Sequence, residues 1–278
     1  MSMDDKICMI TGANSGIGKA TALSIAKMGA VVIMICRDKN RGENAQKEII
    51  NETGNKSVDL FICDLSSQES IYKLAENFKK KYQKLDVLIN NAGVVKTKRI
   101  LTIDGFETTF AVNYLAPFLL TNLLLDIIKE SAPSRIINII SGIHKSGSIN
   151  FDDLQAENKY RSYKAYGQSK LALILFTYEL SKKLEGTSVT VNALHPGFTR
   201  TNIGRDYSVF IRPFTKLSKN PKKGAETSIY LATSPEVEGI TGKYFIKKQQ
   251  KRSSKDSYNE KLAKELWNVS LKLTKLNI

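Results

Sequence analysis

The amino-acid sequence predicts an α/β fold in which a mostly parallel β-sheet is covered by helices on both faces. Short runs rich in β-branched residues alternate with longer amphipathic segments, as in parallel sheets with helical crossovers. Residues 31–35 and 135–140 are almost continuously apolar, as expected for strands that are buried on both sides. Together these observations predict a single doubly wound domain.

We expect seven strands, with helices in the intervals between them. The strands are predicted at residues 6–11, 31–36, 58–63, 86–90, 135–140, 189–194 and 243–246. A chain of 278 residues can form one large domain, and no linker rich in Pro, Gly or Ser interrupts it before a basic stretch at residue 247. The predicted domain therefore spans residues 1–246, and residues 247–278 form a basic extension with an amphipathic helix. Ligands of such sheets bind beyond the carboxyl ends of the strands.

Composition excludes some classes of protein but does not indicate a particular activity. The formal net charge is +15, but the lysines are spread over the chain without a nucleic-acid-binding pattern, so a solvated basic surface is the simpler interpretation. The apolar runs are too short to span a membrane, and the N-terminus does not resemble a secretory signal. Cys8, Cys36 and Cys63 lack disulfide or metal-ligand spacing and are expected to be buried thiols. We expect a cytoplasmic protein without a metal site.

A glycine-rich turn follows the first predicted strand. Gly12, Gly16 and Gly18 lie between that strand and a helix expected to start near Lys19. Glycine permits a tight turn and a close approach of the backbone to a phosphate, while the helix N-terminus offers free N–H groups to the anion. Glycines also form ordinary turns, but the strand–loop–helix context favours a pyrophosphate-binding loop.

Tyr166 and Lys170 are separated by one turn of a predicted helix. Residues four apart lie on the same helical face, and the apolar run at residues 171–176 indicates that this helix is buried. A nearby ammonium favours the phenolate, so Lys170 is expected to lower the pKa of Tyr166 and to make it a proton donor and acceptor near neutral pH. Such pairs also occur by chance in helices, and the interpretation depends on the surrounding motifs.

Several motifs follow one another in a fixed order. After the glycine loop come Asp64-Leu65, Asn90-Asn91-Ala92-Gly93, Asn113, Ser141, the Tyr166/Lys170 pair and Pro196-Gly197. This order and the spacing Gly-x3-Gly-x-Gly resemble the short-chain dehydrogenase/reductase family over residues 5–246. Cys36-Arg37-Asp38, His195-Pro-Gly and the long gap between Ser141 and Tyr166 resemble its retinol-dehydrogenase-like branch. The resemblance implies a Rossmann-type fold and hydride transfer between a nicotinamide cofactor and a carbonyl or alcohol substrate, which is lipophilic in that branch.

The resemblance also implies a set of cofactor-binding residues, and the residues after the second strand are predicted to select the cofactor. The planar guanidinium of Arg37 suits a ribose 2′-phosphate, which predicts NADP(H). If Asp38 points at the ribose instead, NAD(H) is expected. Asn90 is also expected to approach the ribose. The predicted cofactor-binding residues are Gly12, Asn14, Ser15, Gly16, Ile17, Gly18, Arg37, Asp64, Leu65, Asn91, Ala92, Gly93, Tyr166, Lys170, Pro196, Gly197, Thr199 and Thr201.

Four residues are predicted to form the catalytic set. Hydride transfer to a carbonyl places negative charge on oxygen, so the site must supply a proton and hydrogen-bond donors. The resemblance makes Tyr166 the proton donor, Ser141 a donor to the substrate oxygen, and Lys170 a ligand of the nicotinamide ribose. It also implies that Asn113 holds a water linked to Lys170, and Pro117 suggests a disturbed helix there. By itself, an asparagine such as Asn113 is more often a helix-packing amide than a catalytic residue.

The last third of the chain contains two less specific segments. Residues 202–221 are expected to form the loop over the substrate, where Tyr207, Phe210, Ile211 and Phe214 line an apolar pocket or simply pack. In the extension, one apolar helical stripe is predicted. That helix is expected to dock on its own domain, to contact another subunit or to lie on a membrane surface. The stripe consists of Leu262, Leu266, Val269, Leu273 and Leu276.

Other interpretations remain open at this point. A non-catalytic dinucleotide sensor or an acyl-carrier-linked ketoreductase would share the fold, and a nucleic-acid-binding protein would rest on charge alone. Ser141, His144 and His195 suggest a serine hydrolase, but the nucleophile elbow Gly-x-Ser-x-Gly is absent from the sequence. An NADP(H)-dependent oxidoreductase is the favoured interpretation. Homo-oligomers are expected, because the helices around Asn113 and Tyr166 commonly pair between subunits in relatives.

Overall fold

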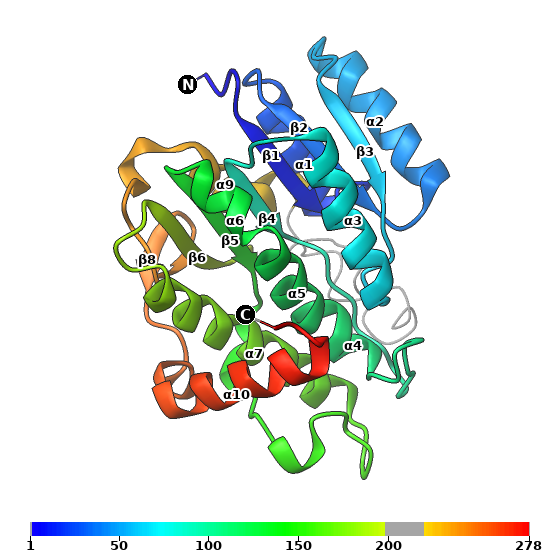
Figure 1. The fold of residues 1–278 in the computed structure, drawn as a ribbon, viewed down its shortest axis with the longest axis vertical. Helices are drawn as coiled ribbons and strands as arrows, with labels where there is room; N and C mark the ends of the chain where they lie inside the picture. The colour runs from blue at the N-terminus through cyan, green and yellow to red at the C-terminus, as the bar shows by residue number, and fades with distance from the viewer. Residues whose placement is uncertain (1, 198–219, 278) are drawn as a thin grey trace.

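Helices cover both faces of a central β-sheet in the computed structural model, which describes residues 2–197 and 220–277 (Figure 1). The strands of this part of the chain are β1 (Ile7–Thr11), β2 (Val31–Cys36), β3 (Val58–Ile62), β4 (Val87–Asn90), β5 (Ser134–Ile139), β6 (Val189–His195), β7 (Tyr244–Ile246) and β8 (Gln249–Lys251). They form one sheet in the order β3-β2-β1-β4-β5-β6-β7-β8. β1 to β7 are parallel to their neighbours, and β8 is antiparallel to β7.

Helices fill the crossovers between the parallel strands. They are α1 (Gly16–Ala26), α2 (Lys39–Thr53), α3 (Gln68–Lys81), α4 (Thr108–Phe110), α5 (Ala116–Leu123), α6 (Leu125–Glu130), α7 (Ser162–Lys183), α9 (Pro221–Thr233) and, after the sheet, α10 (Glu260–Thr274). A π-helical turn at Ala111–Leu115 joins α4 to α5. Among the helices that the structure describes, none is both long and apolar enough to cross a bilayer.

Two hydrophobic cores lie on opposite faces of the sheet. One forms beneath α3, α5 and α7, and the other beneath α1, α2 and α9. Successive strand residues alternate between them, so that Met9 and Leu88 belong to the first core and Ile10 and Ile89 to the second. Both sets are fully buried. This arrangement explains the nearly continuous apolar runs, because neither face of a central strand meets water.

The strand order reverses beside β1. The chain passes from β1 to β2 and β3 on one side, and then returns to place β4, β5 and β6 on the other. The loops that follow β1 and β4 therefore leave the sheet in opposite directions, and a crevice opens between them at the carboxyl ends of the strands. This topology confirms the doubly wound fold predicted from the sequence.

β8 is absent from the seven strands predicted above. It pairs with β7 through a two-residue turn, in which Lys247 and Lys248 have φ angles of 51° and 63°. Left-handed φ angles at both central positions are typical of a type I′ hairpin turn, which usually contains Asn or Gly. Two lysines give no such sequence signal, and the exposed strand has no apolar residue. The domain boundary proposed at residue 246 therefore falls inside a hairpin of the sheet.

α10 docks on its own domain, which was one of the three predicted alternatives. Its buried residues are Ala263, Leu266, Trp267, Ser270 and Thr274, whereas the other four members of the predicted stripe are half-buried at its side. The predicted stripe packs against the first core, and small and hydroxyl residues beside it permit the closest approach. The hydroxyl of Ser270, for example, forms a 2.6 Å hydrogen bond with the buried hydroxyl of Tyr114.

Trp267 joins α10 to two helices of the first core. Its ring centroid lies 5.1 Å from that of Phe118 on α5 and 5.8 Å from that of Phe176 on α7. The ammonium of Lys183 lies 4.7 Å from the centre of the same ring. In Figure 1, α10 lies across this side of α7. It therefore covers part of the helical face through which self-association was expected.

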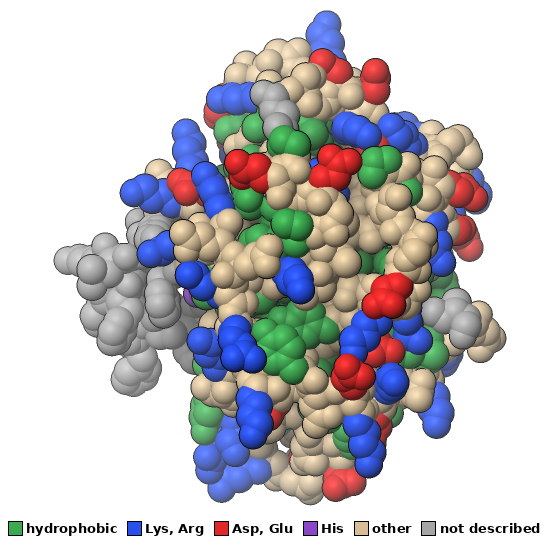
Figure 2. Space-filling model, turned by 90° about the vertical axis from the view of Figure 1, so that its left-hand side faces the viewer, with side chains coloured by type: hydrophobic (Ala, Val, Ile, Leu, Met, Phe, Trp, Pro, Cys, Tyr) green, Lys and Arg blue, Asp and Glu red, His purple; other side chains and the backbone are tan. Residues whose placement is uncertain are grey.

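Basic side chains are widely distributed on the face of the molecule in Figure 2. Lys and Arg side chains extend from its top to its bottom, with Asp and Glu among them. Several lysines of the described surface form ion pairs, including Lys79 with Asp126 and Lys182 with Glu260, each at 2.6 Å. This distribution is typical of a solvated basic surface.

Replacing Trp267 with Ala should lower the free energy of unfolding by about 3–5 kcal/mol, because it leaves a cavity between three helices. Urea unfolding followed by circular dichroism measures this difference. Lys264→Ala on the exposed face of the same helix is the control, and it should change stability by less than about 0.5 kcal/mol. Equal effects of the two substitutions would contradict the docked position of α10.

Candidate active site

A cleft of about 880 Å³ opens at the carboxyl ends of the parallel strands. Almost all the described residues predicted for the site line this cleft. Thr199, Thr201 and the four apolar residues of the predicted substrate loop lie outside the described residues, and Asn113 lies behind the wall of the cleft. The predicted residues that line the cleft are Gly12, Asn14, Ser15, Gly16, Ile17, Gly18, Arg37, Asp64, Leu65, Asn91, Ala92, Gly93, Ser141, Tyr166, Lys170, Pro196 and Gly197.

The glycine loop connects β1 to α1 and ends in a free helix N-terminus. Gly12 has a φ angle of 68°, and a Cβ atom on Gly18 would lie 2.4 Å from the carbonyl oxygen of Gly12. Only a residue without a side chain permits this contact between helix and loop. α1 begins at Gly16, three residues before the predicted start. Its first N–H groups therefore face the cleft, as a phosphate-binding loop requires.

Asn91 holds the glycine loop from the neighbouring strand, whereas Asn90 does not reach the cleft. The Asn91 side chain donates to the carbonyl oxygen of Thr11 at 2.7 Å, and its backbone N–H donates to the Thr11 hydroxyl at 2.9 Å. Asn90 is buried and donates to Thr121 and Asn138 inside the sheet. The prediction that Asn90 approaches the ribose was therefore wrong, because its side chain points to the opposite side of β4.

Two guanidinium groups line the cleft at the end of β2. Arg37 is exposed there, and Arg41 joins it from the first turn of α2. Between them, Asp38 is the N-cap of α2, and its carboxylate accepts the N–H of Arg41 at 3.0 Å. Sequence reasoning missed Arg41, although its spacing of four from Arg37 was available as a signal. Arg37 lies just before α2 and Arg41 lies in its first turn, so the start of the helix brings both residues to the cleft.

Two thiols and the Asp64 carboxylate lie near this end of the cleft, which Cys63 and Asp64 line. Burial raises the pKa values of the Cys36 and Cys63 thiols to about 11, so both are protonated at neutral pH. Asp64 accepts hydrogen bonds from the backbone and hydroxyl of Ser66 at 2.9 and 2.7 Å, while Ser67 caps α3. The cap of α3 is therefore Ser67 and not Asp64. The prediction of buried free thiols is confirmed.

Ser141, Tyr166 and Lys170 meet at the end of the cleft beside β5. Ser141 follows β5 directly, and Tyr166 and Lys170 lie one turn apart on α7. Ser141 lies next to the phenol of Tyr166, and its hydroxyl lowers the pKa of that phenol. The Lys170 ammonium lies 5.9 Å from the centre of the Tyr166 ring and donates to the Ile139 carbonyl at 2.9 Å. The predicted side-chain triad is thus assembled on one wall.

The pKa values of this group differ from the prediction in direction. Burial raises the pKa of the Tyr166 phenol, and the hydrogen bond with Ser141 opposes that rise. Burial also lowers the pKa of Lys170, to about 8. The sequence predicted a lower pKa for Tyr166 from the nearby ammonium. Loss of hydration determines both shifts, because burial penalises the charged form of each group.

Asn113 lies in the π-helical turn and supports the cleft from behind. Its side chain accepts the N–H of Val94 at 2.8 Å and donates to the Val94 carbonyl at 2.9 Å. It also donates to the Ser169 hydroxyl at 3.1 Å. Pro117 has no N–H for the carbonyl four residues earlier, and Ala116 bonds to Ala111, five residues back. The predicted disturbance of this helix is therefore a π-helical turn.

His144 does not form a hydrolase triad with Ser141. The Nδ1 atom of His144 lies 2.7 Å from the backbone carbonyl of Ser141, not from its hydroxyl. His195 lines the cleft, and burial lowers its pKa. The hydroxyl of Ser141 accepts the backbone N–H of Ile143 at 3.5 Å instead. His144 therefore does not provide the base that would activate this serine as a nucleophile.

Comparison with known proteins identifies the family. Residues 6–209 match the family model of the short chain dehydrogenases. This chain belongs to the short-chain dehydrogenase/reductase family. Retinol dehydrogenase 14 of Homo sapiens is 45% identical, over 96% of this chain and 86% of that protein. Retinol dehydrogenase 13 of Homo sapiens is 46% identical, over 98% of this chain and 85% of that protein. The predicted family and its retinol-dehydrogenase-like branch are confirmed.

Solved structures of the family share the fold of this short-chain dehydrogenase. A protein of Mycobacterium paratuberculosis superimposes with a TM-score of 0.82 at 32% identity, over 99% of this chain and 96% of its own. A short chain dehydrogenase of Escherichia coli CFT073, solved with NADPH, has a TM-score of 0.72 at 25% identity, over 88% of this chain and 98% of its own. The chain is therefore an oxidoreductase of a family that binds nicotinamide dinucleotides.

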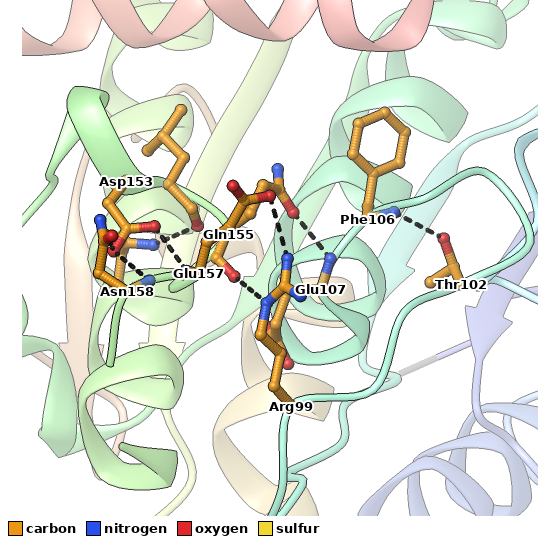
Figure 3. A network of polar contacts seen from close by, with 10 residues as sticks. Arg99, Thr102, Phe106, Glu107, Asp153, Gln155, Glu157 and Asn158 are labelled. Atoms are coloured by element: carbon orange, nitrogen blue, oxygen red, sulfur yellow. Dashed lines mark hydrogen bonds and ion pairs between the residues drawn. The ribbon is translucent and has the colours of Figure 1, made fainter. Parts of the chain in front are cut away.

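The long segment between Ser141 and Tyr166 of this dehydrogenase is held by hydrogen bonds and an ion pair to Arg99 and Glu107, which precede Asn113 in the chain (Figure 3). Arg99 donates to the carbonyl of Gln155 at 2.9 Å and pairs with Glu157 at 3.1 Å. The side chain of Gln155 accepts the backbone N–H of Glu107 at 2.7 Å. The buried Glu107 carboxylate in turn caps α4 through two backbone N–H groups. These contacts were not visible in the sequence, because they join separate loops.

Lys170→Met should increase the free energy of unfolding at pH 7 by about 1–3 kcal/mol, because a buried ammonium is replaced by an apolar chain of similar length. The unfolded chain keeps the Lys170 proton up to about pH 10.5, whereas the folded protein releases it near pH 8. The stability of the wild type therefore rises between these values, and the advantage of the variant shrinks. Urea unfolding at pH 7 and pH 10 measures both effects.

Lys164→Met, on an exposed position of the same helix, is the matched control. It should show neither the gain at pH 7 nor its loss at pH 10. A Lys170→Met variant that is less stable than the wild type at pH 7 would show that burial of the ammonium is compensated in the folded protein.

Proposed function

We propose that this chain is an NADP(H)-dependent oxidoreductase that passes hydride between nicotinamide and a lipophilic carbonyl or alcohol, with Tyr166 as the general acid and base. The observation that supports this most directly is the position of two chemically different groups in one cleft. Ser141, Tyr166 and Lys170 lie beside β5, and Arg37 and Arg41 lie beyond β2. β1 and β4 separate those strands, so an extended dinucleotide can reach both groups.

The residues of the cleft fit a dinucleotide. Gly16 has a φ angle of 57°, and a Cβ atom there would meet no other group within 4 Å, so the backbone of the α1 N-terminus is open to a phosphate. When bound, the nicotinamide supplies or accepts the hydride. Pro196 and Gly197 line the cleft after β6 and are assigned to the nicotinamide end, while Asp64 and Leu65 are assigned to the adenine end.

The protein supplies the proton and stabilises charge on the substrate oxygen. In the direction of reduction, the phenol of Tyr166 donates its proton as negative charge develops on that oxygen, and the hydroxyl of Ser141 donates a hydrogen bond to it. In the direction of oxidation, the Tyr166 phenolate removes the hydroxyl proton. Lys170 stabilises the phenolate, since its pKa near 8 leaves it mostly cationic at neutral pH.

Cofactor preference follows from the carboxylate between the two arginines. Asp38 would favour NAD(H) if it bound the ribose 2′-hydroxyl, but one of its oxygens accepts the N–H of Arg41 at the start of α2. Arg37 and Arg41 both line the cleft and offer planar donors that match a 2′-phosphate. The NADPH complex of the Escherichia coli relative agrees with this preference.

A lipophilic substrate is supported by the apolar residues near Tyr166. Val94, Val112, Ile140 and Ile143 line the cleft on the catalytic side. Most drug-sized ligand sites combine such apolar walls with a few polar groups that fix orientation. The curated relatives are named retinol dehydrogenases, which act on a lipophilic alcohol. An acyl-carrier substrate would instead require a polar phosphate-bearing arm to pass this wall.

Tyr166→Phe should lower kcat by about 10²-fold or more, since the variant lacks the proton that moves in the reaction. Turnover is followed by nicotinamide absorbance over a panel of aldehydes, ketones, steroids and retinoids. Tyr163→Phe, three residues earlier on the same helix and exposed, is the control and should keep wild-type kcat. Binding of NADPH, measured by its fluorescence, should survive in both. Wild-type turnover in Tyr166→Phe would refute the assigned mechanism, and cofactor binding without turnover in the wild type would favour a sensor.

Arg37→Ala and Arg41→Ala should each raise the KM for NADPH by about 10- to 100-fold and leave the KM for NADH nearly unchanged, because each removes a charged hydrogen bond to the 2′-phosphate. Lys39→Ala removes the same charge from an exposed neighbour that does not line the cleft. It should preserve the ratio of the two KM values. A wild-type preference for NADH would show that Asp38 selects the cofactor.

A further inference from the structure

We propose that His144 is a positioning residue that holds Ser141 from behind the cleft, and that the backbone amide of Ser254 holds His144 in place. The inference deepens the proposed function and rests on the role that it gives to Ser141. It also assigns a task to the segment after β8, which the sequence places in a C-terminal extension.

Two hydrogen bonds join His144 to the backbone carbonyl of Ser141. The Nδ1 atom of His144 lies 2.7 Å from the carbonyl oxygen of Ser141, and the backbone N–H of His144 donates to the same oxygen at 3.1 Å. One residue thus binds both lone pairs of this carbonyl. These two hydrogen bonds fix the orientation of the peptide group between Ser141 and Gly142. The directions open to the Ser141 side chain are limited accordingly.

The two hydrogen-bond partners of the His144 ring determine its protonation and tautomer. A carbonyl oxygen can only accept, so Nδ1 carries the proton. On the other side, the backbone N–H of Ser254 donates to Nε2 of His144 at 3.2 Å, so Nε2 has no proton. The ring is therefore neutral, with its proton on Nδ1. The other tautomer would place two donors together at Nε2 and two acceptors together at Nδ1.

The imidazole ring of His144 is tightly packed on all sides. His144 is 0% exposed, and Tyr244 of β7 packs edge-on against it with 5.2 Å between ring centres. Tyr244 is itself 1% exposed. The imidazole cannot swing aside without moving a strand of the sheet. Its bond to Ser141 is consequently a fixed support.

The segment that contains Ser254 is fastened to α7, the helix of Tyr166. Ser253 forms a 2.8 Å hydrogen bond with the hydroxyl of Tyr178 on α7, and its N–H donates to Tyr258 at 3.1 Å. The rings of Tyr178 and Tyr258 stack with centres 5.3 Å apart. The contacts therefore close a circuit, which runs from α7 through residues 253–254 and His144 to Ser141 and returns to α7 at Tyr166.

Two amide substitutions at residue 144 separate its two bonds. In His144→Asn, the amide nitrogen takes the place of Nδ1 and can still donate to the Ser141 carbonyl. In His144→Gln, the amide lies near Nε2 and can still accept from Ser254 but releases Ser141. We expect kcat to fall by about 10- to 100-fold in the Gln variant and by less than about 3-fold in the Asn variant. The dissociation constant for NADPH should stay unchanged in both.

A purely structural role predicts a different result. Both substitutions would then lower the melting temperature, and kcat would change equally or not at all. Equal kcat values in two folded variants would therefore overturn the inference. Restoration of kcat by Asn, at the same melting temperature as Gln, would support it.

Substitutions at Ser254 provide a second test that leaves His144 intact. Ser254 has a φ angle of −69°, which proline adopts, so Ser254→Pro removes the N–H with little change of the backbone at that residue. Ser254→Ala keeps the N–H and is the control. We expect a several-fold lower kcat for Pro than for Ala. Identical kcat values in the two variants would remove Ser254 from the proposal.

A spectroscopic measurement tests the arrangement without turnover. The chain contains two histidines, so isotope-labelled histidine gives two sets of ring-nitrogen NMR shifts, and His144→Asn assigns them. We expect His144 to be neutral and protonated at Nδ1, and Ser254→Pro to change its Nε2 shift. Protonation at Nε2 would overturn the inference. If the wild type shows this tautomer but turns over no carbonyl or alcohol, the proposed function fails while the contact between His144 and Ser141 stands.

Discussion

The site depends on an ammonium group that is buried in the wall of the cleft. Lys170 is 3% exposed, and in the described part of the chain its nitrogen is held by the carbonyl of Ile139 and not by a carboxylate. Gly93 lies beside it, where a Cβ atom would be in ordinary contact with Nζ at 3.7 Å and would crowd the Asn113 oxygen at 3.3 Å. The end of β5, the turn after β4 and the π-helical turn therefore meet at one cation. Loss of hydration destabilises the folded state, and the packing around it must compensate.

Burial acts on both members of the Tyr166/Lys170 pair and favours the neutral form of each. A phenol with a raised pKa keeps its proton until a stronger base arrives, and the alkoxide that develops on a reduced carbonyl is such a base. The free protein is thus prepared for proton donation. Oxidation of an alcohol requires the phenolate first, and for that step the hydrogen bond from Ser141 and the charge on Lys170 must outweigh burial.

Local patterns determined which parts of the structure were predictable. Seven strands, the glycine loop and the one-turn spacing of Tyr166 and Lys170 depend on neighbouring residues, and the structure contains all of them. β8 was missed because its turn consists of Lys247 and Lys248 in a conformation usually given by Asn and Gly. The deeper burial of Ser270 and Thr274 on α10, the missed Arg41 and the direction of the Tyr166 pKa have a common cause. Each depends on what packs against the residue, and a hydrophobic pattern cannot supply that information.

α7 connects the chemistry of the cleft with the end of the chain. Its first turns present Tyr166 and Lys170, its middle carries Phe176 and Tyr178, and both of these contact residues beyond β8. Residues 253–258 lie against the same helix as Trp267, so shortening the chain before residue 252 would remove the support of His144 and the docking of α10 together. A loss of activity after such a truncation would not distinguish instability from a displaced Ser141. Substitutions at His144 and Trp267 act on different segments of α7, and they can therefore separate these two contributions of the C-terminal segment.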